Sequence, residues 1–313
     1  MKKHFKKLLL MALMAVMAVG LIACGTDKSD NESTKEEKTS VTITSLDASK
    51  NEIESEVPYN PKRIAILDLA SLDIIDELGV GDRVVGMAST SIDYLEKYSN
   101  DASIKNLGTI KEADLEAVME CEPDIIFIGG RLSKSYDALS EIAPVVYLAT
   151  DTNEGLVNSV SKNAKTIASI FGMEDKVDSL MSDFGARIDA IKKISSGKTA
   201  LVGMTTSGSF NLLGNDGRCS LIGVEAGFNN LTAAGSTSTH GNESSFETVV
   251  QQNPDYIFVM DRDSAISTAG AKTAKEIVEN ELVKTTDAYK NNHIIYLEHS
   301  NVWYTAEGGI QAL

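Results

Sequence analysis

Short apolar runs and segments of helical periodicity alternate along most of the chain. Near the start of this pattern, Val41–Ser45 alternates polar and apolar residues like an edge strand. The buried strands expected next are Arg63–Asp68, Val84–Met87, Ile125–Ile128 and Val145–Leu148. Between the first two, Ser71–Leu78 carries apolar residues at helical spacing and is followed by glycine. Strands that alternate with helices in this way predict an α/β fold with parallel sheets.

The middle of the chain has a different pattern. Residues 154–194 contain no proline, and apolar residues recur at helical spacing throughout. This predicts two consecutive helices, or one long helix broken near Gly172. A second α/β run begins at Thr199–Thr205, with further strands expected near Ile257–Met260 and Ile294–Leu297. The helical segment is therefore the natural connection between two α/β lobes.

Two stretches of the chain repeat one pattern. Residues 115–131 read LEAVMECEPDIIFIGGR, residues 246–262 read FETVVQQNPDYIFVMDR, and the two align without a gap. Each runs from an amphipathic helix through a Pro-Asp turn into a short strand and ends in an arginine, Arg131 or Arg262. This order is common in α/β proteins, but the seven identical positions favour an internal duplication. Both arginines would follow the carboxyl ends of strands, where α/β proteins bind ligands.

The N-terminus has the features of a lipoprotein signal. Lysines precede an apolar run from Leu8 to Ala23, which ends in the lipobox-like LIAC. We expect cleavage before Cys24 and lipid attachment to its thiol; an uncleaved anchor is the alternative, although the run is short for a bilayer span. The following polar segment cannot bury itself and predicts a flexible tether. The expected parts are a signal peptide, a tether, an N-terminal lobe, a connecting helical segment and a C-terminal lobe, at residues 1–23, 24–40, 41–153, 154–195 and 196–313.

Charge and cysteine content narrow the function classes. The formal net charge is −16, and loss of the four signal-peptide lysines would leave −20. Such an acidic body disfavours nucleic acid and anionic membrane surfaces as partners. Cys121 and Cys219 fall in different lobes, and we expect two unpaired thiols rather than a disulfide. The sequence stops at Leu313 in EGGIQAL, which is typical of the first turn of a helix, so we expect a last helix beyond it.

Three segments carry a resemblance to a known family. VPYNPKRIAILD (57–68), LGTIKEADLEAVMECEPDIIFIGGR (107–131) and FETVVQQNPDYIFVMDR (246–262) occur in the order found in the siderophore-binding lipoproteins of ABC importers. The chain most resembles the members for catecholate siderophores of the enterobactin and petrobactin kind. The resemblance implies two Rossmann-like α/β lobes joined by a long rigid helix. It also implies a shallow ligand cleft between lobes that close only slightly.

The resemblance implies arginine contacts to the ligand. Ferric catecholates are anionic and aromatic, and a guanidinium can both hydrogen-bond oxygen and stack on rings. Carried over by motif, the cleft arginines are Arg131, Arg218 in GNDGR, and Arg262. The only tryptophan, Trp303, is a further candidate contact.

The resemblance also implies two ligands for Fe(III). A siderophore with only two catechols leaves coordination positions open, and members of this subgroup fill them with a histidine and a tyrosine. The matching residues are His240 in STHGNES and Tyr304 in NVWYTAEGG. Tyrosinate is a hard oxygen ligand that suits Fe(III), and imidazole is an acceptable partner.

Glu116 and Glu247 hold equivalent positions in the two repeats. Family members dock one glutamate per lobe onto arginines of the permease, so these two residues are the expected docking contacts.

These features predict a monomeric binding protein without an intrinsic cofactor. It would deliver a ferric catecholate to an ABC permease from a lipid anchor outside the membrane of a Gram-positive bacterium. A haem-binding lipoprotein of the same fold stays open, because histidine and tyrosine also ligate haem. A sensor or surface interaction protein that feeds no transporter is a second alternative. An enzyme is favoured least, since the sequence has no Walker A loop, GxSxG or HExxH.

Overall fold

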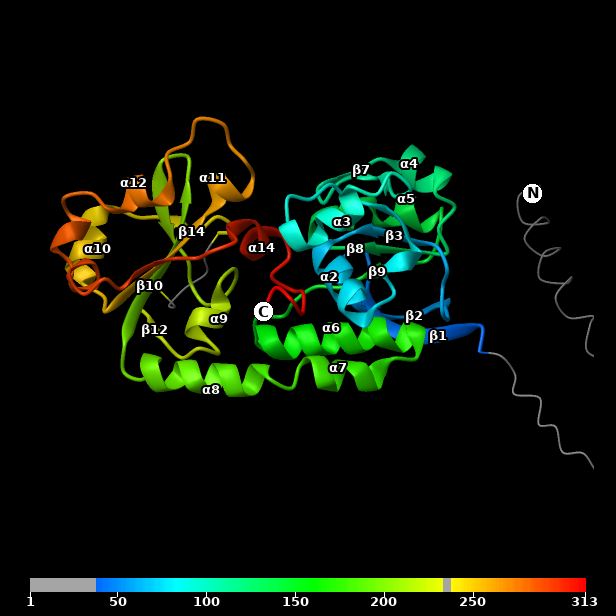
Figure 1. Ribbon diagram of the computed structural model, residues 1–313, viewed down its shortest axis with the longest axis horizontal. Helices are drawn as coiled ribbons and strands as arrows, with labels where there is room; N and C mark the ends of the chain where they lie inside the picture. The colour runs from blue at the N-terminus through cyan, green and yellow to red at the C-terminus, as the bar shows by residue number, and fades with distance from the viewer. Residues whose placement is uncertain (1–37, 233–237) are drawn as a thin grey trace, which may run out of the picture. The chain divides into compact units, whose positions relative to one another are not determined.

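The computed structural model describes residues 38–232 and 238–313, which fold as one unit made of two α/β lobes (Figure 1). The expected fold class is therefore confirmed. The predicted signal peptide, Cys24 and most of the tether lie outside the described residues. Within these two ranges, no helix is both long and apolar enough to span a bilayer.

The N-terminal lobe is built on a five-stranded parallel sheet in the order β5-β4-β3-β8-β9. Its strands are β3 (Ile64–Leu67), β4 (Val84–Met87), β5 (Lys105–Asn106), β8 (Ile125–Ile128) and β9 (Val145–Tyr147). The strands expected from the apolar runs of this lobe are confirmed. In β3, Ile64 and Ile66 pack in one core and Ala65 and Leu67 in another. Burial on both faces explains why such strands are continuously apolar.

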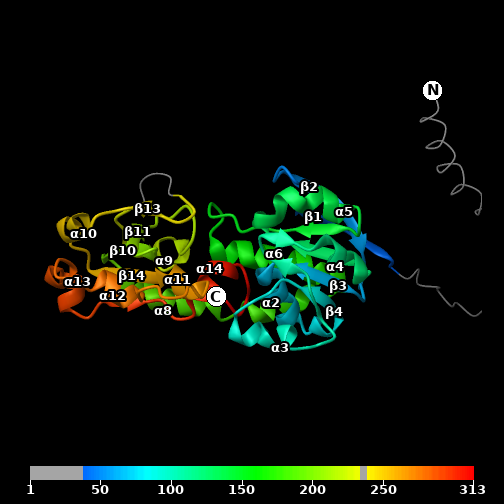
Figure 2. The same ribbon diagram turned by 90° about the horizontal axis from the view of Figure 1, so that it is seen from above.

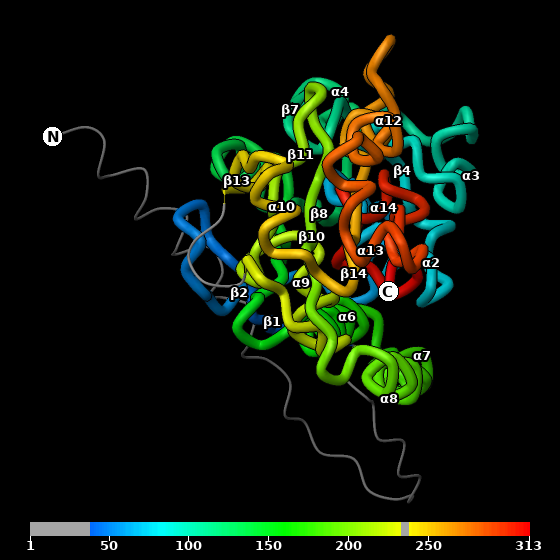
Figure 3. The backbone as a smooth tube through the Cα atoms, turned by 90° about the vertical axis from the view of Figure 1, so that its left-hand side faces the viewer, coloured from blue at the N-terminus to red at the C-terminus, as the bar shows by residue number. Residues whose placement is uncertain are grey.

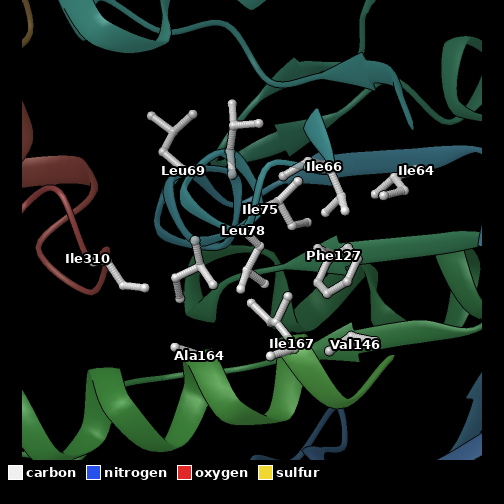
Figure 4. Packing of buried hydrophobic residues seen from close by; sticks show 14 of the residues in the cluster. Ile64, Ile66, Leu69, Ile75, Leu78, Phe127, Val146, Ala164, Ile167 and Ile310 are labelled. Carbon is white, nitrogen blue, oxygen red and sulfur yellow. The ribbon is translucent and has the colours of Figure 1, made fainter. Parts of the chain in front are cut away.

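Helices cover both faces of this sheet. The helices α2 (Leu69–Leu78) and α6 (Leu156–Phe171) lie on one face, and α4 (Leu115–Glu120) and α5 (Tyr136–Ser140) on the other. Figure 4 shows Phe127 of β8 and Ile75 of α2 beside Ile167 of α6. The shorter elements of the lobe are η1 (Gly81–Arg83), η2 (Asp93–Leu95), α3 (Glu96–Ser99), β6 (Gly108–Thr109), β7 (Glu112–Ala113) and η3 (Gly130–Ser135).

The first strand forms a separate hairpin. β1 (Ser40–Leu46) pairs antiparallel with β2 (Glu52–Pro58) and not with the main sheet, so it is no edge strand of that sheet. The hairpin is fixed to β9 by Ser45, whose hydroxyl donates to the carbonyl of Tyr147 at 3.2 Å and accepts from its N–H at 3.0 Å.

The C-terminal lobe has a six-stranded mixed sheet in the order β13-β11-β10-β14-β15, with β12 also paired to β10. Its strands are β10 (Thr199–Thr206), β11 (Ser209–Leu212), β12 (Asn229–Asn230), β13 (Asn242–Glu243), β14 (Tyr256–Asp261) and β15 (Ile294–Tyr296). Among the strands of this sheet that the structure describes, β11 runs opposite to the others and so pairs antiparallel with both β10 and β13. The helices are α9 (Ser220–Gly223), α10 (Phe246–Gln252), α11 (Arg262–Ala265), α12 (Ala274–Val278), η4 (Val283–Thr285), α13 (Asp287–Lys290) and α14 (Ser300–Thr305).

Three helices, and not one or two, occupy the connecting segment. After α6, the chain continues through α7 (Glu174–Leu180) and α8 (Phe184–Ser195). The expected break is present, because Gly172 ends α6 in a left-handed conformation with φ of 67°. A second break at residues 181–183 had no signal in the sequence. Since α6 packs in the N-terminal core, α7 and α8 carry the chain to the second lobe, end to end (Figures 1 and 3).

The chain crosses back between the lobes after α14. Tyr304 packs in a core of the C-terminal lobe, whereas Val302 and Ile310 pack in the core of the N-terminal lobe. The buried carboxylate of Asp73 in α2 accepts the N–H groups of Gln311 at 2.9 Å and Ala312 at 3.1 Å. Helix α14 lies between the lobes in Figures 1 and 2 and belongs to both. The last helix that the sequence pattern predicts after EGGIQAL stays a prediction.

The two copies of the repeat fold alike. Helix α4 follows Asp114 and α10 follows Ser245, and each of these side chains accepts an N–H from the first helical turn. Glu122 and Asn253, at the same place in the two copies, both have positive φ, of 43° and 40°. The common turn geometry supports the interpretation of the repeat as one supersecondary unit used twice.

The aspartate of each Pro-Asp pair ties its strand to the neighbouring one. Asp124 Oδ2 accepts the N–H groups of Lys62 at 2.7 Å and Arg63 at 2.9 Å, just before β3. Asp255 Oδ2 accepts the N–H and the hydroxyl of Thr199, at 2.9 and 3.0 Å, where β10 begins. The duplicated aspartate therefore aligns the two central strands of each lobe.

Replacing Asp124 or Asp255 with alanine should lower the free energy of unfolding by about 1–3 kcal/mol, because backbone N–H groups would lose their acceptor. Chemical denaturation followed by circular dichroism measures this loss. Asp178→Ala, which breaks an exposed ion pair with Lys165, is the matched control and should cost about 0.5 kcal/mol or less. Losses as small as that of the control would contradict the assigned role.

Candidate functional site

Three arginines surround the ring of Tyr304. The guanidinium carbons of Arg131, Arg218 and Arg262 lie 5.3, 4.4 and 5.5 Å from its centroid. Tyr304 itself is buried, with 4% of its surface exposed. Each cation is close enough to the ring for a cation–π interaction. The structure thus brings together four residues that the sequence places far apart.

The arginines reach Tyr304 from both lobes. Arg131 lies in η3 just after β8 of the N-terminal lobe, and Arg262 begins α11 directly after β14 of the C-terminal lobe. Arg131 donates to the carbonyl of Tyr304 at 3.0 Å, and Arg262 Nε donates to its hydroxyl at 3.2 Å. Arg218 comes from the loop before α9 and donates to the carbonyl of Thr239 at 3.1 Å. The equivalent arginines of the repeat therefore meet at one side chain.

His240 lies at the hydroxyl end of the same tyrosine. Its Nε2 is 3.2 Å from the hydroxyl oxygen of Tyr304, and the two rings are nearly parallel, at 23°. The amide of Asn211 on β11 donates to the His240 carbonyl at 2.9 Å and fixes the loop. The imidazole nitrogen and the phenol oxygen are thus close enough to contact one bound atom together.

The cations change the protonation of both groups. Burial opposes ionisation of Tyr304, but the hydrogen bond from Arg262 and the charges of Arg262, Arg218 and Lys111 outweigh it and lower the pKa of the phenol. Burial and the same cations lower the pKa of His240. Both shifts favour the tyrosinate and the neutral imidazole relative to the free side chains, and these are the forms that bind metal ions.

A cavity of about 660 Å³ adjoins this cluster. Arg131, Arg218, Trp303 and Tyr304 line it, together with residues of both lobes. His240 and Arg262 are not among its lining residues and contact the far, hydroxyl end of Tyr304. A volume of this size is in the range of small-molecule sites.

Three charged residues near the site were missed in the sequence. Lys111 lies in the β6–β7 turn, and no pattern links it to Tyr304. Asp68 caps α2, lines the cavity and has a pKa raised mainly by burial. Glu307, which follows Tyr304 on the same segment, also lines the cavity. Asp68 could have been suspected, because it ends a predicted strand in the same way as the arginines.

The other candidate residues lie elsewhere. Glu116 and Glu247 are exposed and occupy the same position, the second residue, of α4 and α10. Cys121 and Cys219 are both free and buried. Across residues 38–232 and 238–313, no cluster of three or more His, Cys, Asp or Glu side chains could hold a metal ion.

Comparison with known proteins identifies the family. The sequence profile of the periplasmic binding proteins matches residues 64–300. The chain belongs to the periplasmic binding protein family. Within this family, the petrobactin-binding protein YclQ of Bacillus subtilis (strain 168) is 36% identical over 98% of this chain and 96% of YclQ. The crystal structure of YclQ matches with a TM-score of 0.80, covering 88% of this chain and 95% of that one.

Two further relatives are also named for siderophore binding. The periplasmic catecholate-siderophore binding protein VctP of Vibrio cholerae is 31% identical, with a TM-score of 0.78 over 87% of this chain and 96% of VctP. The ferric-anguibactin-binding protein FatB of Vibrio anguillarum is 26% identical over 82% of this chain and 80% of FatB. The likeness extends over both lobes in each case.

Arg262→Met should raise the pKa of Tyr304, because the phenolate would lose a hydrogen bond and a nearby positive charge. Ultraviolet difference titration of tyrosinate, with Tyr304→Phe as the subtracted reference, measures the change. Arg187→Met removes an arginine that stacks on Phe184 at 5.1 Å, and it should leave the Tyr304 titration unchanged. An unchanged titration in Arg262→Met would show that this arginine does not stabilise the phenolate.

Proposed function

We propose that this protein captures a ferric catecholate siderophore outside the membrane and delivers it to an ABC permease. The observation that carries the proposal is the cluster of Arg131, Arg218 and Arg262 around Tyr304 beside a cavity between the lobes. Membership of a family whose relatives are named for petrobactin and catecholate siderophores supports the same ligand class.

Local charge explains how an acidic protein binds an anion. The chain has a formal net charge of −16, yet three guanidinium groups and Lys111 gather at one tyrosine. The Debye length is about 8 Å at physiological ionic strength, so carboxylates on the distant surface are largely screened. The cleft cations would touch the ligand, where screening is weak. They would also stack on catechol rings as they now stack on Tyr304.

The donor geometry supports direct iron ligation by His240 and Tyr304. Adjacent positions of an octahedral ion with ligand distances of about 2.0–2.1 Å are roughly 3 Å apart. The imidazole nitrogen and phenol oxygen are 3.2 Å apart, so both fit neighbouring positions on one ion. They would complete the shell of a bis-catecholate complex. A tris-catecholate has no open position and would use the arginines alone.

Delivery would depend on the equivalent glutamates of the two lobes. Glu116 and Glu247 are exposed, sit at the same place in duplicated helices, and do not line the cavity. One acidic contact per lobe would suit a permease that presents an arginine to each. A lipid on Cys24 and the polar segment after it would hold a monomeric binding protein near that permease.

His240→Ala and Tyr304→Phe should each weaken binding of a two-armed ferric catecholate at least about tenfold, or about 1.4 kcal/mol, and a three-armed one less. Quenching of Trp303, which lines the cavity, measures both affinities. His293→Ala is the matched control, because His293 stacks on Tyr256 at 4.3 Å outside the cavity lining.

Equal losses for the two complexes would contradict iron ligation by His240 and Tyr304. A Soret band after loading with haem, without quenching by either ferric catecholate, would support the haem-binding alternative instead.

Charge reversal at Glu116 and Glu247 together should abolish most siderophore-dependent iron uptake in cells and leave ferric catecholate affinity unchanged. Radioactive iron uptake and Trp303 quenching measure the two properties separately. Glu174→Lys reverses an exposed charge in the first turn of α7 and should leave uptake normal. Normal uptake in the double variant would contradict docking through these glutamates and would favour the sensor alternative.

A further inference from the structure

The cavity that would receive an anion also contains a poorly solvated carboxyl group. Glu307 follows α14 on the same segment as Tyr304 and lines the cavity. Its Oε1 accepts the backbone N–H of Cys219 at 2.8 Å, where α9 begins. This bond fixes the side chain against the C-terminal lobe. The carboxyl group is therefore held where a ligand enters.

Several charged groups surround this carboxyl. Arg218 comes from the segment before α9 and favours its ionised form, whereas Glu225, after α9, disfavours it. The Cys219 thiol is buried and its own pKa is raised well above the usual value, so it stays neutral. The other charged residues on the cavity wall are Lys50, Asp68, Arg131, Asp151 and Asp216. Burial is the largest influence and raises the pKa of Glu307 to about 7.

An ionised Glu307 would oppose an anionic ligand, whereas a protonated one could donate a hydrogen bond to it. We propose that Glu307 is a specificity-determining residue that takes up one proton from solvent when an anionic ferric complex enters the cavity. The residue would thereby adjust the charge of the cavity to that of the ligand. This inference rests on the proposed function, since it requires a ferric complex with negative charge.

The direction of the pH dependence follows from the charges. A bound anion disfavours the ionised carboxylate and so raises the pKa of Glu307 above its value in the free protein. Binding then takes up a proton at any pH between the two values, and affinity rises as pH falls through this range. Well below pH 7, Glu307 is already protonated in the free protein, and affinity should no longer change. The slope can reach about tenfold per pH unit.

Glu307→Gln separates this role from a purely structural one. The amide keeps an oxygen for the Cys219 N–H but carries no charge at any pH. If Glu307 only positions Arg218 or α9, the variant should bind more weakly at every pH. If it is a proton acceptor, the variant should bind more tightly than the unsubstituted protein at alkaline pH.

The probe is the Fe(III) complex of a hexadentate tris-catecholate, and Trp303 quenching gives its affinity between about pH 6.5 and 9. We use the Tyr304→Phe background, so that the phenol does not contribute to the titration. In that background affinity should fall about tenfold from pH 7 to 9, within the slope set by one proton. With Glu307→Gln added, affinity should be constant and equal to the value at low pH.

Two further measurements make the result specific. Calorimetry in buffers of different ionisation enthalpy should give net proton uptake on binding near pH 8, and none with Glu307→Gln. Infrared difference spectra should gain a protonated carboxyl band on binding that the variant lacks. Asp151→Asn removes the same charge from an exposed cavity residue and should shift affinity by one factor at every pH.

An unaltered pH slope in Glu307→Gln, or weaker binding by this variant at every pH, would overturn the proposed role of Glu307 and leave the siderophore function intact. Absence of quenching by any ferric catecholate in the unsubstituted protein would overturn the proposed function, and the role of Glu307 with it.

Discussion

The proposed ligand site is built around one tyrosine that is held by cations from both lobes. Tyr304 lies on a helix whose residues pack in the cores of both lobes, and Arg131 and Arg262 approach it from the N-terminal and the C-terminal lobe. The contacts therefore do two things at once. They tie the two lobes together, and they hold the Tyr304 hydroxyl beside His240.

Gathering guanidinium groups away from water is unfavourable by itself. Burial and the neighbouring charge of Arg218 lower the pKa of Arg131, which reports this cost. The tyrosine ring and the Tyr304 carbonyl offset part of it, because they supply a π face and hydrogen-bond acceptors for the cations. An incoming anion would replace these partial charges with full ones. Binding would thus be favoured because the arginines are already in place in the free protein, while their charges are only partly compensated there.

The sequence predicted the strands that are buried on both faces of a sheet, because such strands are continuously apolar. Strands such as β8 are apolar throughout because helices cover both sides of the sheet. Once these strands are predicted, the position of the arginine at the end of each duplicated strand is predicted with them. The neighbourhood of His240 and Tyr304 could not be predicted from spacing, since 64 residues separate them. Only the crossing of the chain at α14 brings them together. Lys111 and the break at residues 181–183 had no local signal at all.

The two copies of the repeat account for the equivalent strands and arginines of the two lobes. The other candidate ligand-binding residues lie outside the repeat. Asp124 and Asp255 align equivalent strands, and the two strand-end arginines result from that alignment. His240, Tyr304 and Glu307 lie outside both copies of the repeat. His240 comes from the loop before α10, whereas Tyr304 and Glu307 come from α14 and the residues that follow it. On the proposed function, the duplicated units would supply the arginines that contact the anion. The segments outside them would set which ferric complex the site accepts and how its protonation responds.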